Sequence, residues 1–155
     1  MPPITVSAEV NRSAEEVFAY ATDPSRFSEW QRGVVSGHME SDGAVKVGDH
    51  CHTTRRIGFS DRPDFSELVR FDPPRHWSVR GLAGPIRAMV DVTVAPISQI
   101  SAQLTIALAF EGHGIGRLLV PLVVERQARR EMPVNLAALK NRLETSHHDE
   151  TTSQA

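Results

Sequence analysis

The sequence contains one cysteine, Cys51, among its 155 residues. A single cysteine excludes an internal disulfide framework, and it excludes a zinc site built from several cysteines. An excess of charge of either sign is also missing, because 17 Lys and Arg stand against 19 Asp and Glu and give a formal net charge of −2. Proteins that bind the phosphates of nucleic acids usually carry an excess of Lys and Arg, so we expect no nucleic-acid partner.

Long apolar runs are absent as well. No segment of the sequence reaches the about 20 apolar residues of a membrane-spanning helix, so we expect no stable membrane insertion. The N-terminus, Met1 to Ile4, lacks a basic segment followed by an apolar stretch, and the simplest expectation is a reduced, cytoplasmic setting. Hydrophobic residues make up 40% and charged residues 23%, as in ordinary globular proteins. We predict one domain over residues 1–145 and a disordered polar tail over 146–155.

The beginning of the chain predicts one strand followed by two short helices. Apolar residues alternate with polar ones over 4–10, which is typical of a half-buried strand. Ser13 and Glu16 have the spacing of a capping box, so a helix should start there. Pro24 ends that helix and suits the first turn of a second one, for which Asp23 would be the cap.

In the rest of the chain, the spacing of apolar residues changes once, from a period of two to a helical period. From about residue 34 to 110, alternating apolar residues separated by turn signals predict antiparallel strands with one buried face. Apolar residues then recur at helical spacing, which predicts one long helix over about 117–144. Pro121 falls near the first turn of this helix, whereas Pro133 lies in its interior and should kink or break it.

This order of elements predicts an α+β fold: a curved antiparallel sheet of about seven strands, closed by the long C-terminal helix. A sheet with one apolar face needs a cover, and only the last helix, spanning roughly 40 Å, is long enough. The two short helices that follow the first strand can only plug one end. We expect the long helix to face the sheet through Ile115, Leu119, Leu122, Val123, Leu136, Leu139 and Leu143.

The same order, together with several loose motifs, resembles the SRPBCC superfamily, and more narrowly its polyketide cyclase/dehydrase branch among the START-like and birch-pollen-allergen-like proteins. The resemblance covers about residues 3–144. It rests on the segment from Ser13 to Pro24, on Trp30, on Val47 to Asp49, on Phe71 to Arg75, and on Leu139 to Glu144. It implies a helix-grip fold around an elongated apolar cavity that binds small hydrophobic molecules. It does not imply one reaction, because such folds host carriers and enzymes alike.

Strand parity predicts which side chains face this cavity. Cys51, Thr53, Arg55 and Ile57 share one face and should point inward. On the next strand, Phe65, Val69 and Phe71 would carry Glu67 inward, where it could pair with Arg55. Such a pair would be a structural ion pair at the rim or a pair that orients a ligand. A bulge near Leu68 would reverse this parity.

The predicted cavity lining combines one residue of the second short helix with residues of the strands and of the long helix. Its members are Trp30, Cys51, Thr53, Arg55, Phe65, Glu67, Val69, Trp77, Val90, Val92, Leu104, Ile106, Leu119, Leu122 and Val123. Between the two apolar parts of the helix lies the polar stretch 125–131. We interpret it as a solvated charged face, with Arg126 or Arg130 pointing into the cavity as the alternative.

No diagnostic catalytic motif is present. A cyclase or dehydratase would need an acid or base inside the cavity, and the weak candidates are Glu67, Arg55 and Tyr20. His50 and His52 share a strand face, but no third ligand is evident, so we expect no metal site. The segment Gly112–Gly116 lacks the spacing and the βαβ context of a dinucleotide loop, and we expect no cofactor.

These observations favour binding of a small hydrophobic ligand (a lipid, a sterol or an aromatic polyketide-like molecule), by a carrier or a sensor. The first alternative is a cyclase or dehydratase that acts in the same cavity. The second is a protein-interaction module that uses the apolar start of the long helix, residues 115–124, for example in a homodimer.

Overall fold

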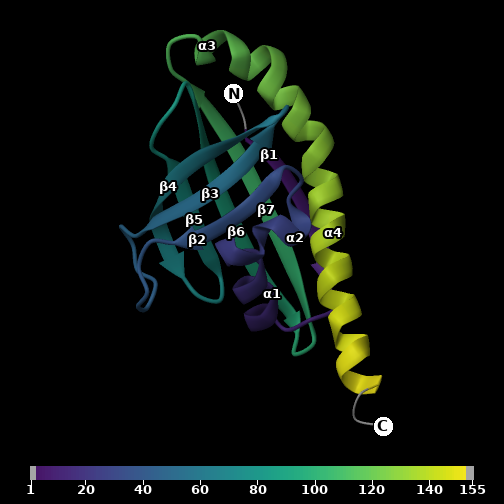
Figure 1. The fold of residues 1–155 in the computed structure, drawn as a ribbon. Coiled ribbons are helices and arrows are strands. Elements are labelled where there is room, and N and C mark those ends of the chain that lie inside the picture. The colour runs from purple at the N-terminus through teal and green to yellow at the C-terminus, as the bar shows by residue number, and fades with distance from the viewer. Residues whose placement is uncertain (1–2, 153–155) are drawn as a thin grey trace.

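The computed structural model describes residues 3–152, and within that range it confirms the predicted α+β helix-grip architecture (Figure 1). The N-terminal elements are β1 (Ile4–Val10), α1 (Ala14–Ala21), the 3₁₀ turn η1 (Pro24–Arg26) and α2 (Phe27–Trp30). The strands β2 (Val34–Met39), β3 (His50–Ile57), β4 (Ser60–Asp72), β5 (His76–Gly81), β6 (Ile86–Ser98) and β7 (Ser101–Gly112) follow. The chain continues through α3 (Gly116–Leu119), the π-helical turn η2 (Val120–Val124) and α4 (Glu125–Thr152).

The two predicted helix caps are present. The Glu16 backbone N–H donates to the Ser13 hydroxyl at 3.2 Å, and that hydroxyl donates to the Glu16 carboxylate at 3.1 Å. At η1 the Asp23 carboxylate accepts from the Ser25 backbone N–H at 3.0 Å, and Pro24 occupies the first helical position. These caps satisfy N–H groups that a helix start leaves without intrahelical partners.

The strands of the described range form one antiparallel sheet in the order β1-β7-β6-β5-β4-β3-β2. The sheet curls around an apolar interior, and α4 runs along β1 and α2 on one side of it (Figure 1). Val10, Val94, Leu104 and Leu139 are almost fully buried in the core that the sheet, α1 and α4 enclose. Burial of apolar area, at about 25 cal/mol per Å², is therefore the main force that holds the helix on the sheet.

The long C-terminal helix differs from its prediction in three ways. Pro133 does not break α4, because its ring lies on the exposed side, where water can reach the backbone carbonyl that loses its N–H donor. Pro121 lies in η2, which separates α3 from α4. The helical backbone continues to Thr152, past the predicted domain boundary at 145, and residues 153–155 of the predicted tail lie outside the described residues. No helix in residues 3–152 is long and apolar enough to cross a membrane.

A bulge in β4 changes which residues face the interior. Leu68 pairs with Val79, but the next pair is Arg70 with Ser78, so Val69 is an extra residue. N-terminal to this bulge the even-numbered residues face inward, and Leu68 is fully buried. The prediction that Phe65, Glu67 and Val69 point inward is therefore wrong. Phe65 and Glu67 lie on the outer face, and Val69 is 38% exposed at the bulge. Phe71, beyond the bulge, packs against the core as predicted.

Candidate functional site

Burial along the concave face of the sheet changes from one end to the other. Val92 and Leu104 face inward near α1 and are 2% and 0% exposed. Further along the same inward-facing rows, beyond the buried pair Val92 and Ile106, Val90 and Leu108 are only half-buried. Because Val90 pairs with Leu108 in register and shares its face with Val92, orientation cannot explain the difference. The sheet therefore lacks a complete cover toward this end.

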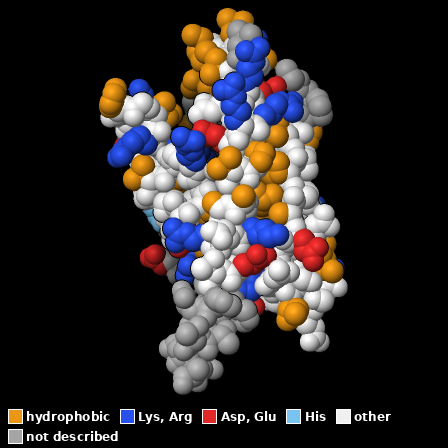
Figure 2. All heavy atoms as spheres, turned by 90° about the vertical axis from the view of Figure 1, so that its right-hand side faces the viewer, with side chains coloured by type: hydrophobic (Ala, Val, Ile, Leu, Met, Phe, Trp, Pro, Cys, Tyr) orange, Lys and Arg blue, Asp and Glu red, His pale blue; other side chains and the backbone are white. Residues whose placement is uncertain are grey.

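We call this partly uncovered part of the concave face the open recess, and define it by Ala88, Val90, Leu108 and Phe110, which are all half-buried. It lies toward the end of the molecule where β7 leads into α3 (Figure 1). The β3–β4 hairpin also ends on this side (Figure 1). Hydrophobic side chains and Lys and Arg side chains gather at the same end of the surface (Figure 2). Such an apolar surface between secondary-structure layers is a usual place for a ligand.

The predicted lining residues separate into three groups. Trp30, Trp77, Val92, Leu104 and Ile106 are buried in the packed core, so they can form at most the base of a ligand site. Cys51, Thr53, Arg55 and Val90 lie on the concave face toward the recess; Cys51 is buried, Thr53 and Val90 are half-buried, and Arg55 is exposed. Leu119 and Val123 are 36% and 53% exposed, so they are not packed into the core between helix and sheet, and the side chain of Leu122 lies outside the description. A ligand contact of any of these residues stays a prediction.

The apolar start of the C-terminal helices is largely uncovered. Ile115 and Leu118 are each 66% exposed, whereas Val120 is buried. Ile115 was predicted to face the sheet, and this is wrong because the turn from β7 into α3 holds it at the end of the sheet. A side chain at Gly116 would collide with the backbone carbonyl of Pro85, so glycine is required where this turn meets the β5–β6 loop.

Polar groups line the inner side of the β3–β4 hairpin. Cys51 is 2% exposed, and its burial raises the pKa of the thiol to about 11, while a hydrogen bond with Ser66 partly opposes that shift. The thiol is therefore protonated at neutral pH and is a poor nucleophile. Asp64 lies opposite Thr53 on the same face, and desolvation raises the pKa of its carboxyl, partly offset by the charge of Arg55.

The weak catalytic candidates do not come together. Glu67 lies on the outer face, where its carboxylate is 3.4 Å from the Arg80 guanidinium. The Tyr20 ring lies under the Arg26 guanidinium, 5.7 Å from its centre, and burial, followed by the charge of Glu29, raises the pKa of its hydroxyl. Of these candidates, Arg55 lies on the concave face of the sheet, and its side chain is exposed. The predicted Arg55–Glu67 pair is therefore wrong, because the bulge places the two side chains on opposite faces.

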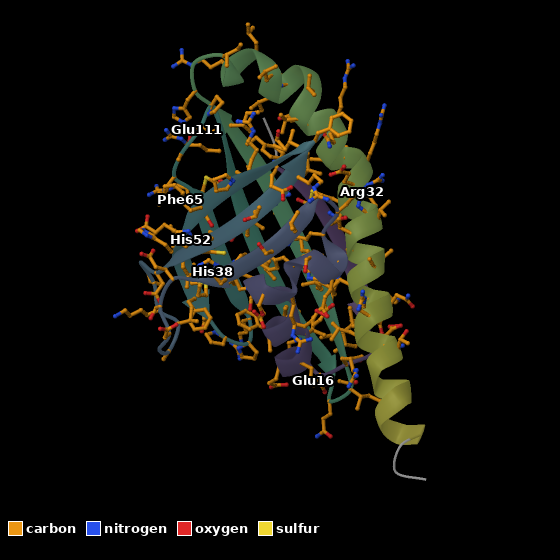
Figure 3. All side chains as sticks on the ribbon, in the orientation of Figure 1. Glu16, Arg32, His38, His52, Phe65 and Glu111 are labelled. Atoms are coloured by element: carbon orange, nitrogen blue, oxygen red, sulfur yellow. The ribbon has the colours of Figure 1, made fainter. Side chains whose placement is uncertain are left out.

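The outer face of the same strands carries a histidine cluster that the sequence suggested only in part. His38 and His52 are stacked with their ring centres 5.1 Å apart, and His52 stacks in turn on Phe65 (Figure 3). Glu40 lies 3.0 Å from His50 and 3.3 Å from His52, and these two hydrogen bonds lower the pKa of its carboxyl. Within the described residues no group of three His, Cys, Asp or Glu is arranged to hold a metal ion.

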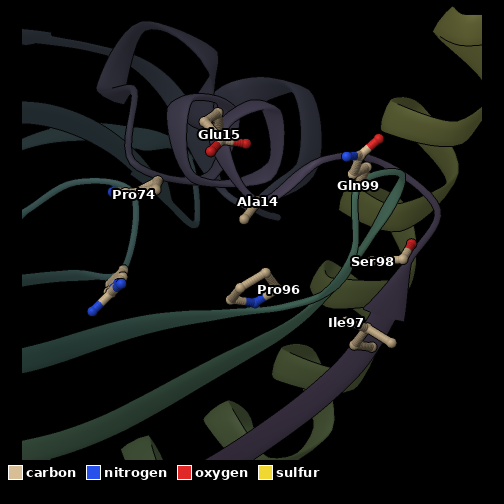
Figure 4. Close-up of a pocket in the computed structure, with 8 residues that line it drawn as sticks. Ala14, Glu15, Pro74, Pro96, Ile97, Ser98 and Gln99 are labelled. Carbon is tan, nitrogen blue, oxygen red and sulfur yellow. The ribbon is translucent and has the colours of Figure 1, made fainter.

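A separate depression of about 590 Å³ lies between the start of α1 and the β4–β5 and β6–β7 turns (Figure 4). It is lined by Ala14, Glu15, Pro74, Arg75, Pro96, Ile97, Ser98 and Gln99. Most of these residues are exposed, so the depression is open to water rather than enclosed. It lies outside the layer between the sheet and α4, and we assign it no role.

Comparison with known proteins agrees with this geometry. A family model described as polyketide cyclase/dehydrase and lipid transport matches residues 1–144. No curated protein sequence matches the chain. Among solved structures, the Zhui aromatase/cyclase from Streptomyces sp. R1128 superposes with a TM-score of 0.74 at 13% identity, covering 92% of this chain and 93% of that one.

Two further structures share the fold. A START superfamily protein from Mycobacterium smegmatis superposes with a TM-score of 0.70 at 15% identity, over 94% of this chain and 99% of that one. The di-domain aromatase/cyclase BexL from the BE-7585A biosynthetic pathway gives a TM-score of 0.73 at 17% identity, over 93% of this chain. The chain spans 47% of that di-domain protein's length. At these identities the likeness concerns the fold alone.

Proposed function

Because the chain belongs to the polyketide cyclase/dehydrase and lipid transport family, we propose that it binds a small hydrophobic molecule in the open recess, as a carrier or a sensor. The observation that carries this proposal is the loss of burial along a continuous inward-facing apolar surface, from Val92 and Leu104 to Val90 and Leu108. Apolar surface left partly uncovered inside a fold gains free energy when a ligand covers it.

The polar groups beside the recess support binding rather than chemistry. The Cys51 thiol is protonated, Glu67 lies on the outer face, and burial raises the pKa of the Tyr20 hydroxyl. Asp64 is the one carboxyl group in the inner hairpin row formed by Thr53, Arg55, Arg62 and Asp64. A single acid without a partnered base is a weak basis for catalysis of proton transfer.

The second candidate is a cyclase or dehydratase that acts in the same recess. It is favoured by the two aromatase/cyclases among the structural neighbours and by the Asp64 carboxyl on the concave face, whose pKa is raised by desolvation. Under this reading, the molecule bound in the recess would leave it chemically changed.

Thermal unfolding in the presence of ligand pools tests the proposal. We expect at least one pool of sterols, fatty acids or aromatic polyketides to raise the melting temperature by roughly 5–10 °C when the ligand is at a hundredfold excess over its Kd. Mass spectrometry of the molecule released afterwards separates the two candidates: recovery unchanged indicates a carrier or sensor, and recovery as a cyclised or dehydrated product indicates an enzyme. No shift with any pool would count against both.

A further inference from the structure

Two arginines face each other on the concave side of the β3–β4 hairpin, where both side chains are exposed. Arg55 and Arg62 are direct partners in the antiparallel register, and both belong to the inward set that includes the buried Cys51. Directly opposed side chains in a sheet have Cβ atoms only about 5 Å apart, so like charges in these positions repel each other. The sequence had suggested Glu67 as the partner of Arg55, and the register replaces that carboxylate with a second guanidinium.

Neither guanidinium has a hydrogen bond or an ion pair with the described residues. The contrast with Arg56 on the outer side of the same hairpin is direct, since Arg56 binds both carboxylate oxygens of Asp61, at 2.8 and 3.3 Å. Asp64 lies on the inner face, one row from the arginine pair, but no oxygen of its carboxylate comes within 4.0 Å of either guanidinium. Within this inner row, two positive charges therefore stand against one carboxyl group.

The arginine pair is continuous with the open recess. Ser66 pairs with Gly81, the Gly81 backbone lies against that of Ala88, and Ala88 pairs with Phe110. This row crosses the sheet into the recess, and Arg62 lies four residues from Ser66 along β4. At about 3.3 Å per residue, the backbone of Arg55 and Arg62 is about 13 Å from the row that joins Ser66 to Phe110. The distance is shorter if the hairpin curves inward.

We propose that Arg55 and Arg62 bind the carboxylate head group of an amphipathic ligand whose apolar part lies in the open recess. A carboxylate placed between the two guanidiniums removes their mutual repulsion and accepts charge-assisted hydrogen bonds from both. The separation from the recess suits a medium-chain fatty acid or an aromatic acid of similar length. This inference rests on the proposed function, because it assigns the ligand class of the same site.

Displacement of a neutral fluorescent probe tests the inference. N-phenyl-1-naphthylamine reports occupancy of the recess, and dodecanoate and dodecan-1-ol compete with it as a matched acid and alcohol. We expect dodecanoate to bind about tenfold more tightly than the alcohol, which is the ratio that one charge-assisted hydrogen bond supplies. The Arg55→Gln and Arg62→Gln variants should each lose about tenfold in affinity for dodecanoate and less than about twofold for the alcohol.

Arg70→Gln is the matched control, because it removes the same charge from the outer face of β4. It should leave both affinities unchanged, and a uniform loss across all three variants would indicate a net-charge effect and overturn the inference. Equal affinities for dodecanoate and dodecan-1-ol would also overturn the inference. A preference for dodecanoate that persists in both Arg55→Gln and Arg62→Gln would overturn it as well. In those cases binding of the naphthylamine keeps the proposed function standing. If the naphthylamine itself does not bind, both proposals are wrong.

Discussion

An Ala88→Trp variant is expected to lose binding of N-phenyl-1-naphthylamine by at least about a hundredfold. Ala88 faces inward on β6, opposite Phe110, and is half-buried in the open recess. An indole ring there would occupy the surface that a ligand needs, since a tryptophan covers about 150–250 Å². A hundredfold loss corresponds to about 2.7 kcal/mol of binding free energy, well within the reach of that area. Fluorescence titration of both proteins measures the ratio.

Ala109→Trp is the control for this experiment, because Ala109 lies on the outer face of β7, in register with the exposed Met89. We expect this variant to bind the probe within about twofold of the original affinity. Thermal melts of both variants establish that they fold. If the Ala88→Trp protein does not fold, Val90→Phe provides a smaller obstruction of the same surface. Unchanged binding in a folded Ala88→Trp protein would show that the probe binds elsewhere.

Truncation of two leucines on the same face of β7 should have very different effects on stability. Leu104→Ala is expected to lower the free energy of unfolding by about 3 kcal/mol, because Leu104 is fully buried and its removal leaves an enclosed cavity. Leu108→Ala should cost about 1 kcal/mol, because Leu108 is half-buried beside space that solvent already reaches. Urea unfolding curves with an unchanged slope measure both differences.

Ile100→Ala serves as the surface reference, because Ile100 is 76% exposed in the β6–β7 turn and should change stability by less than about 0.5 kcal/mol. Similar costs for Leu104→Ala and Leu108→Ala would mean that the interior is packed equally well at both ends. The open recess would then have no basis.

The fold was accessible from the sequence because its signals are local. Alternation over β1, β6 and β7 indicates their buried faces, and the Ser13–Glu16 capping box starts α1 where predicted. The order of these elements leaves the last helix as the one possible cover of the sheet. Each of these inferences depends on residues that are close together in the chain, so one sequence was sufficient.

The site was less accessible because it depends on long-range register. One extra residue, Val69, reverses the face of the first half of β4, and the segment from Phe65 to Phe71 allows a bulge near Leu68 without requiring one. The pairing of Arg55 with Arg62 follows from the tight hairpin turn between Ile57 and Ser60. The exposure of Ile115 and Leu118 likewise depends on how β7 leads into α3.

Methyl NMR during titration with N-phenyl-1-naphthylamine tests the central claim most directly. If the ligand enters between the sheet and the C-terminal helices, the methyl resonances of Val90 and Leu108 should shift strongly, while those of the packed Leu139 should shift little. Shifts confined to Ile115, Leu118 and Leu119 would instead indicate attachment to the exposed start of the helices, and would contradict binding in the interior. A spectrum without shifts would contradict binding altogether.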